Sequence, residues 1–403
     1  MKKFIMAVQH LFAMFGATVL VPILTGFNPA VAICSAGVGT LIFHFCTKRK
    51  VPVFLGSSFA FIPVVIAAKK AYGGDMAYAQ GGIIVAGLIY LIIALVAKLV
   101  GVETIKKYFP PQVTGAMIIV IGLNLLPTAI TMASEKFIIA GVTLATAILI
   151  NIFGKGFIKQ LGILIAVFMG YGVCLVLGYV DVAKMTEATM FSIPQFTLPK
   201  FGLQAIVMIA PVVLATVMEH IGDITTNGTV VGQNFIEDPG LNRTLLGDGL
   251  ASIFAGFIGG PANTTYGENT AVLAITKNYD PSILRITACI AIVLSFVGKF
   301  GGFLQSIPGA VMGGVSVMLF SMITFVGFKT IRDNHSFDGW KNIAVILLIL
   351  LVGLGTTYAA NYGIHIGIPV GNSVEITGLS LAALVGIIAN RIINNADFKK
   401  EQA

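Results

Sequence analysis

Four acidic residues lie inside long apolar stretches of the sequence, where a charge is costly: Glu219, Asp223, Asp248 and Glu268. An aspartate at the centre of a membrane-spanning helix costs about 2.5–3.5 kcal/mol on insertion scales, so such acids are candidates for function. Glu219 and Asp223 are four residues apart and share one helix face. Two carboxylates this close in an apolar setting cannot both ionise easily, which predicts a proton-binding pair. The alternatives are that this pair only hydrogen-bonds to neighbouring helices and that Asp248, between two glycines, anchors a broken segment.

Polar and helix-breaking residues interrupt two other apolar stretches. Residues 55–58 read Leu-Gly-Ser-Ser, and residues 261–269 read Pro-Ala-Asn-Thr-Thr-Tyr-Gly-Glu-Asn. Non-helical backbone at membrane depth is tolerated only where it is buried in protein or lines a cavity. Half-helices that begin near Phe59 and Glu268 would present free N–H groups and positive dipole ends. With carboxylates opposite, they predict a site for a small ring or chain that carries both carbonyl and N–H groups; the alternative is ordinary helix kinking.

The composition indicates where these residues lie. Hydrophobic residues make up 57% of the 403 residues and charged residues only 10%, and the mean hydropathy is +0.94. A soluble domain carries about 25% charged residues, so the sequence predicts a polytopic membrane protein and excludes a cytosolic enzyme, a nucleic-acid-binding protein and a secreted module. The net charge of +8 fits cytoplasmic loops better than a polyanionic partner. The four cysteines form no CxxC pair, which predicts neither a metal site nor disulfides.

The apolar runs divide into fourteen candidate membrane segments, since a spanning helix needs roughly 20 apolar residues. They are residues 4–24, 29–46, 51–68, 79–98, 113–131, 137–154, 160–180, 203–227, 244–259, 260–276, 283–300, 307–328, 341–359 and 373–393. With the N-terminus inside, 19 of the 25 lysines and arginines fall on the inner side. Because positive charge favours the cytoplasmic side, both termini are predicted to be cytoplasmic.

A weak internal repeat relates the two halves of the chain. His10, Phe43 and Pro52 are echoed by His220, Phe254 and Pro261, each at an offset of about 210 residues. This offset spans seven segments, an odd number, so the second half would be inverted relative to the first. Inverted repeats are typical of secondary transporters. Because no ATP-binding loop accompanies them, we expect transport driven by an ion gradient.

Three motifs carry a resemblance to a known family. Residues 9–18 (Gln-His-Leu-Phe-Ala-Met-Phe-Gly-Ala-Thr), 55–61 (Leu-Gly-Ser-Ser-Phe-Ala-Phe) and 264–269 (Thr-Thr-Tyr-Gly-Glu-Asn) resemble the nucleobase–ascorbate transporters, also called nucleobase:cation symporter 2, and within them the bacterial uracil permeases. The resemblance implies an all-α polytopic fold of 14 segments as two inverted sevens, with short strands in the broken third and tenth segments. It also implies a core domain, residues 1–108 and 201–303, and a gate domain, residues 109–200 and 304–403.

The resemblance implies the residues of the site as well. Substrate-binding residues would be Ala17, Phe59, Glu219, Tyr266, Gly267 and Glu268. Beside these, the spacing of Glu219 and Asp223 predicts the proton-coupling residues, and Ser58, Asp248 and Asn269 are predicted to support the site. No metal and no other cofactor is implied. The chain departs from the family in three places: Ala271 replaces the usual glycine, Asp223 replaces the histidine of the best-known uracil carriers, and Phe320 stands where these can have tyrosine.

The function expected from the resemblance is uracil:proton symport in the bacterial cytoplasmic membrane, by a homodimer in the lipid bilayer, with no nucleic-acid partner. Glutamate at position 268 favours a pyrimidine, because purine carriers of the family typically have glutamine there. The alternatives are a xanthine or urate permease and, less in keeping with an acidic pocket, an anion transporter. A membrane enzyme is the least favoured, and sodium remains an alternative to protons.

Overall fold

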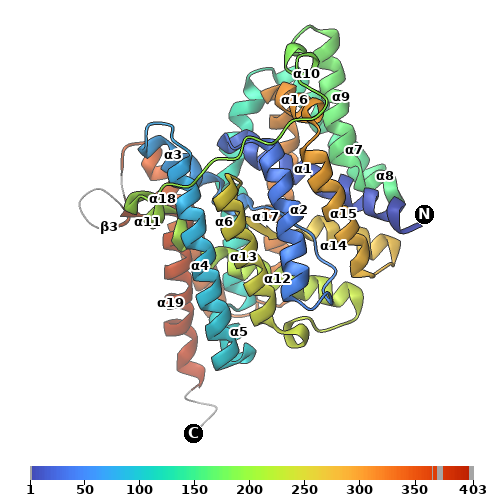
Figure 1. Ribbon diagram of the computed structural model, residues 1–403. Helices are drawn as coiled ribbons and strands as arrows, with labels where there is room; N and C mark the ends of the chain where they lie inside the picture. The colour runs from blue at the N-terminus through green and yellow to red at the C-terminus, as the bar shows by residue number, and fades with distance from the viewer. Residues whose placement is uncertain (1, 365, 370–374, 399–403) are drawn as a thin grey trace.

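The structure, a computed structural model, describes residues 2–364, 366–369 and 375–398 (Figure 1). Its longest helices are α1 (Lys2–Thr25), α2 (Pro29–Cys46), α4 (Ala77–Val100), α6 (Pro111–Ser134), α7 (Phe137–Phe153), α9 (Gly162–Val176), α12 (Val213–Val231), α13 (Leu241–Ile258), α15 (Pro281–Ser295), α17 (Gly309–Asp333), α18 (Trp340–Asn361) and α19 (Gly378–Phe398). Shorter helices are α3 (Ile62–Ala71), α5 (Val102–Tyr108), α8 (Gly156–Gln160), α10 (Ala183–Thr186), α11 (Leu203–Ile209), α14 (Gly267–Thr276) and α16 (Gly298–Ser306). Single turns are η1 (Phe59–Phe61), η2 (Ala210–Val212) and η3 (Ile236–Gly240), and the strands are β1 (Leu55–Ser57), β2 (Asn263–Thr265), β3 (Ile368–Pro369) and β4 (Glu375–Ile376).

Seven helical stretches in the described part of the chain are long and apolar enough to cross a membrane: 3–25, 29–46, 77–100, 111–134, 203–231, 309–333 and 340–360. Four further apolar helices are shorter, at 137–153, 162–176, 281–295 and 378–394. The chain is therefore a mostly helical, multi-pass membrane protein.

Several of the predicted membrane segments do not coincide with a single regular α-helix of the structure. The segment expected at 203–227 lies within the helical stretch 203–231, in which the turn η2 joins α11 to α12 at Pro211, a residue that supplies no N–H donor. Residues 51–68 contain a strand, a turn and a short helix, and residues 260–276 contain β2 and α14. The last predicted segment, 373–393, begins on two residues outside the described chain, and α19 starts at Gly378.

Two groups of helices pack closely within themselves. In the first, α13 lies against α2 and α4, and α15 lies against α1 and α2. In the second, α17 packs along α6 and α7, and α18 lies against α19. Small residues permit this proximity, as helix packing in membranes requires: a Cβ atom on Gly327 would lie 2.6 Å from the carbonyl oxygen of Gly115.

Segments outside the apolar helices tie distant parts of the chain together. Figure 1 shows the extended segment between α10 and α11 crossing the molecule, where the Lys200 N–H donates to the Ala77 carbonyl and the Lys200 ammonium pairs with Asp75 at 2.8 Å. Near the N-terminus, Lys3 pairs with Asp280, which caps α15, at 2.6 Å. The hydrogen bond from Lys3 lowers the pKa of the Asp280 carboxyl to about 2.

Candidate functional site

The two interrupted segments meet at a short antiparallel ribbon. Strand β1 pairs with β2 in a register that sets Leu55 opposite Thr265 and Ser57 opposite Asn263. The backbone hydrogen bonds continue past both strand ends, from the Ser58 N–H to Ala262 and from the Tyr266 N–H to Phe54. This pairing satisfies non-helical backbone in the protein interior and places the starts of η1 and α14 at the two ends of one ribbon.

Tyr266 lies across the ribbon and fixes its neighbours. Its ring is buried, its hydroxyl donates to the Ser57 carbonyl at 2.9 Å, and it accepts from the Thr18 hydroxyl at 3.4 Å. A Cβ atom on Gly56 would lie 2.3 Å from the Tyr266 ring. The predicted residue Ala17 is buried next to Thr18 in α1, so α1, β1 and the start of α14 meet at this tyrosine.

Replacing Gly56 by alanine is therefore expected to displace Tyr266 and weaken ligand binding. Overpacking a close contact costs about 1–3 kcal/mol, so thermal unfolding in detergent should shift to lower temperature and the affinity for the transported ligand should fall about fivefold or more. Gly141, where a Cβ atom meets nothing within 4 Å, provides the control: Gly141→Ala should leave binding unchanged. Equal affinities for Gly56→Ala and the unchanged chain would contradict the contact.

The acidic residues face the ribbon from α12 and α14. The Asp223 carboxylate accepts a hydrogen bond of 3.1 Å from the Thr265 hydroxyl, and Glu268 lies in the first turn of α14. Glu219, Asp223 and Glu268 are close enough to repel one another when charged. A Cβ atom on Gly267 would meet only the Asp223 carboxylate, at 3.7 Å. The structure thus gathers these acids and Gly267 at one place.

Asp248 lies near enough to act on Glu219 and Asp223 by its charge, and it makes a contact that the sequence did not reveal. It is completely buried in the middle of the continuous helix α13. Its carboxylate lies 2.8 Å from Nδ1 of His220, also completely buried. In the sequence, His220 serves only as a repeat match and not as a residue with a chemical role. The signal that could have revealed it is its position directly after Glu219, as a second ionisable residue in an apolar helix.

The remaining predicted residues surround the ribbon. Phe59 packs edge to face against Phe320 of α17, with ring centroids 5.9 Å apart, and so joins the two helix groups. Asn269 is buried and donates to the His10 carbonyl at 3.0 Å, which holds α14 against α1. Ser58 contributes its backbone to the ribbon, whereas its buried hydroxyl has no partner.

Unpaired buried polar atoms gather around this region, although native structures leave few of them. Within the described residues they include Gln9 Oε1, Ser58 Oγ, Tyr90 Oη, Glu219 Oε2, His220 Nε2, Asp248 Oδ1, Thr264 Oγ1 and Asn269 Oδ1. No group of three His, Cys, Asp or Glu side chains suited to a metal ion occurs in the described chain. Donors and acceptors of this kind suit a small polar organic ligand.

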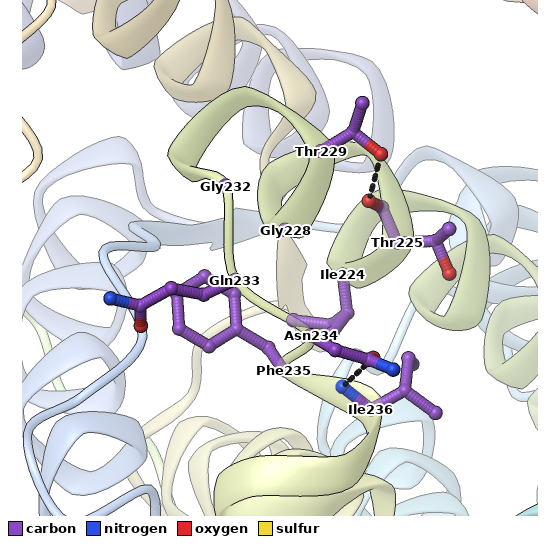
Figure 2. A pocket seen from close by; sticks show the side chains of 9 residues that line it. All are labelled: Ile224, Thr225, Gly228, Thr229, Gly232, Gln233, Asn234, Phe235 and Ile236. Carbon is purple, nitrogen blue, oxygen red and sulfur yellow. Dashed lines mark hydrogen bonds between the residues drawn. The ribbon is translucent and has the colours of Figure 1, made fainter.

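A separate cavity of ≈ 410 Å³ lies at the end of α12 (Figure 2). Its threonine hydroxyls already donate to helix carbonyls, Thr225 to Ile221 and Thr229 to Thr225. Asn234 accepts from the Ile236 N–H, and Figure 2 shows the Gln233 side chain pointing away from the threonines. This cavity therefore offers a ligand fewer free polar groups than the ribbon does.

The comparison with known proteins identifies the kind of protein to which this site belongs. A sequence profile of the permease family matches residues 1–361. The chain belongs to the permease family. This permease is 39% identical over 406 residues to a probable uracil permease of Haemophilus influenzae, covering 98% of this chain and 95% of the relative. It is 41% identical over 417 residues to the uracil permease of Bacillus subtilis, covering 98% and 93%.

These relatives confirm the resemblance inferred from the three motifs, and they show that the chain is a transporter rather than an enzyme. Solved structures show the fold that the permease shares. The transmembrane domain of the cyanobacterial bicarbonate transporter BicA matches with a TM-score of 0.64 at 15% identity, covering 96% of both chains. The structure of SLC26A9 matches with a TM-score of 0.71 at 10% identity, covering 97% of this chain and 64% of the other.

Proposed function

We propose that this permease imports uracil into bacterial cells by symport with protons. The observation that supports this most directly is the set of acceptors and donors at one ribbon: the carboxylates of Glu219 and Glu268 near each other, and helix starts at Phe59 and Gly267 beyond the two ends of the ribbon. Uracil presents two N–H donors and two carbonyl acceptors on a flat ring, which matches carboxylates on one side and helix-start N–H groups on the other. The names of the full-length relatives support the same substrate.

In this proposal each residue of the site has one task. Glu219 and Glu268 accept from the ring N–H groups, the backbones of Phe59 and Gly267 donate to its carbonyls, and Ala17 and Tyr266 pack against its faces. Glu219 and Asp223 share the coupled proton. Three further residues support this arrangement. Ser58 contributes a backbone hydrogen bond to the ribbon, Asp248 contacts His220, and Asn269 donates to the His10 carbonyl.

The proposed architecture comprises fourteen segments in two inverted sevens, with both termini in the cytoplasm. The core domain, 1–108 and 201–303, would carry the ribbon and the acids, and the gate domain, 109–200 and 304–403, would pack against it through Phe320. The two closely packed helix groups support this division. We further propose that the protein works as a homodimer in the inner membrane.

Uptake of radiolabelled uracil into proteoliposomes tests this function. An imposed inward proton gradient should drive uracil above equilibrium, and a protonophore should abolish the accumulation. Excess xanthine, urate or bicarbonate should leave the uptake unchanged. Accumulation that follows an imposed sodium gradient, or competition by xanthine at concentrations similar to uracil, would contradict the proposed coupling or substrate.

The backbone role of Phe59 predicts a specific order of effects. Proline at position 59 removes the N–H donor at the start of η1, so Phe59→Pro should abolish uracil binding. Phe59→Leu keeps the donor and most of the packing against Phe320, and should retain binding within about fivefold. Calorimetry on purified protein at matched expression measures both; equal losses would assign the contribution to the aromatic ring.

A further inference from the structure

A second cavity, of ≈ 300 Å³, lies beside Phe59, and no residue of β1 or β2 is among its lining residues. It is bounded by α3, α6, the end of α18 and the start of α19, and Phe59 and Ala60 form part of its wall. In the proposed orientation, α18 ends and α19 begins on the outer side of the membrane. The cavity would therefore lie between the outside and the proposed uracil site, with Phe59 belonging to both.

Two polar groups in the cavity wall have unused hydrogen-bonding capacity. Ser380 is only 2% exposed, and its hydroxyl has no partner. Asn124 donates through Nδ2 to the Gly353 carbonyl at 3.3 Å, while its buried Oδ1 has no partner. The neighbouring threonines differ, because Thr356 donates to Val352 and Thr357 donates to Gly353. Unpaired buried polar groups are costly, so Ser380 and Asn124 are suited to a ligand.

The rest of the wall defines what that ligand must be. Its other lining side chains are mostly apolar, among them Phe59, Pro63, Ile121 and Leu125, and Glu375 is the one charged residue in the lining described. A carboxylate there repels anions, and apolar walls suit a flat uncharged ring. The volume is at the lower end of the range for small-molecule pockets. An N–H group facing Asn124 Oδ1 and a carbonyl facing the Ser380 hydroxyl would satisfy both free groups.

We propose that this cavity is a second, outer site that holds the nucleobase before it passes Phe59. This inference rests on the proposed uracil transport and adds a separate binding step to it. The outer site would depend on Ser380 and Asn124, whereas the inner site depends on Glu219 and Glu268. Removing an inner carboxylate should therefore leave the outer site able to bind.

Thiol labelling in proteoliposomes tests this separation. In the full chain with its exposed cysteine replaced, Cys289→Ser, the other cysteines are buried, and Ser380→Cys supplies a thiol in the cavity. A membrane-impermeant thiol reagent added outside should label it, and uracil should slow the labelling at least threefold. The slowing should persist when Glu268→Gln is added. Ser134→Cys, at the exposed end of α6, should be labelled at a rate that uracil does not change.

Uptake kinetics supply an independent measurement. Ser380→Ala should raise the KM for external uracil at least threefold with an unchanged maximal rate, Ser380→Thr should restore the KM, and Ser134→Ala should leave it unchanged. Failure of external labelling, or protection that disappears with Glu268→Gln, would overturn the outer site while transport stands. Absence of uptake by the unchanged chain, with protection of Ser380→Cys intact, would overturn the proposed transport while the outer site stands.

Discussion

Replacing Glu268 by glutamine is expected to lower the affinity for uracil at least about tenfold while the protein stays folded. Glu268 lies in the first turn of α14, at the end of the ribbon. A carboxylate accepts from ring N–H groups with both oxygens, whereas an amide turns one acceptor into a donor that faces an N–H. Mispairing a buried polar group costs about 1–3 kcal/mol, and more when a charge is lost.

Calorimetric titration of purified protein with uracil measures this effect, and thermal unfolding in the same detergent reports whether the fold is kept. Glu237→Gln is the matched control, because Glu237 is exposed in η3 and should bind uracil like the unchanged chain. If Glu268→Gln binds uracil with unchanged affinity, Glu268 does not contact the ligand.

Replacing Asp223 by asparagine is expected to abolish gradient-driven accumulation while exchange across the membrane survives. Asp223 lies one helical turn from Glu219 and accepts from Thr265 of β2. Neighbouring carboxylates in an apolar setting hold protons as a pair, and asparagine cannot take part in this. Concentrative uptake should therefore fall at least about tenfold and lose its response to an imposed pH step. Exchange needs no net proton release and should keep at least about half its rate.

Counterflow and gradient-driven uptake, compared in the same proteoliposomes, measure the two activities for this variant. Asp181→Asn is the control, since Asp181 lies in an exposed connection before α10; both activities should match those of the unchanged chain. If Asp223→Asn accumulates uracil normally and a protonophore still collapses the gradient, Asp223 is not part of the proton route.

The sequence by itself determined the class of the protein and supplied the candidates for its site. Scarcity of charge requires a membrane environment, and in that environment each acid in an apolar run stands out. Glycine, proline and polar residues at 55–58 and 261–269 marked the interrupted segments, because such backbone must be buried in protein or line a cavity. These features can be read from the sequence because each depends only on the types and spacing of residues within one segment.

The tertiary structure decided which of these residues meet. Ser57 and Tyr266 are 209 residues apart in the sequence, yet the tyrosine hydroxyl donates to the serine carbonyl. The buried contact of His220 with Asp248 depends on which faces of α12 and α13 pack together. Hydrophobic periodicity indicates a buried face but not its partner, because in an almost uniformly apolar helix every face resembles the others. Close packing of small residues and satisfaction of buried polar groups select the pairing, and both exist only in the folded chain.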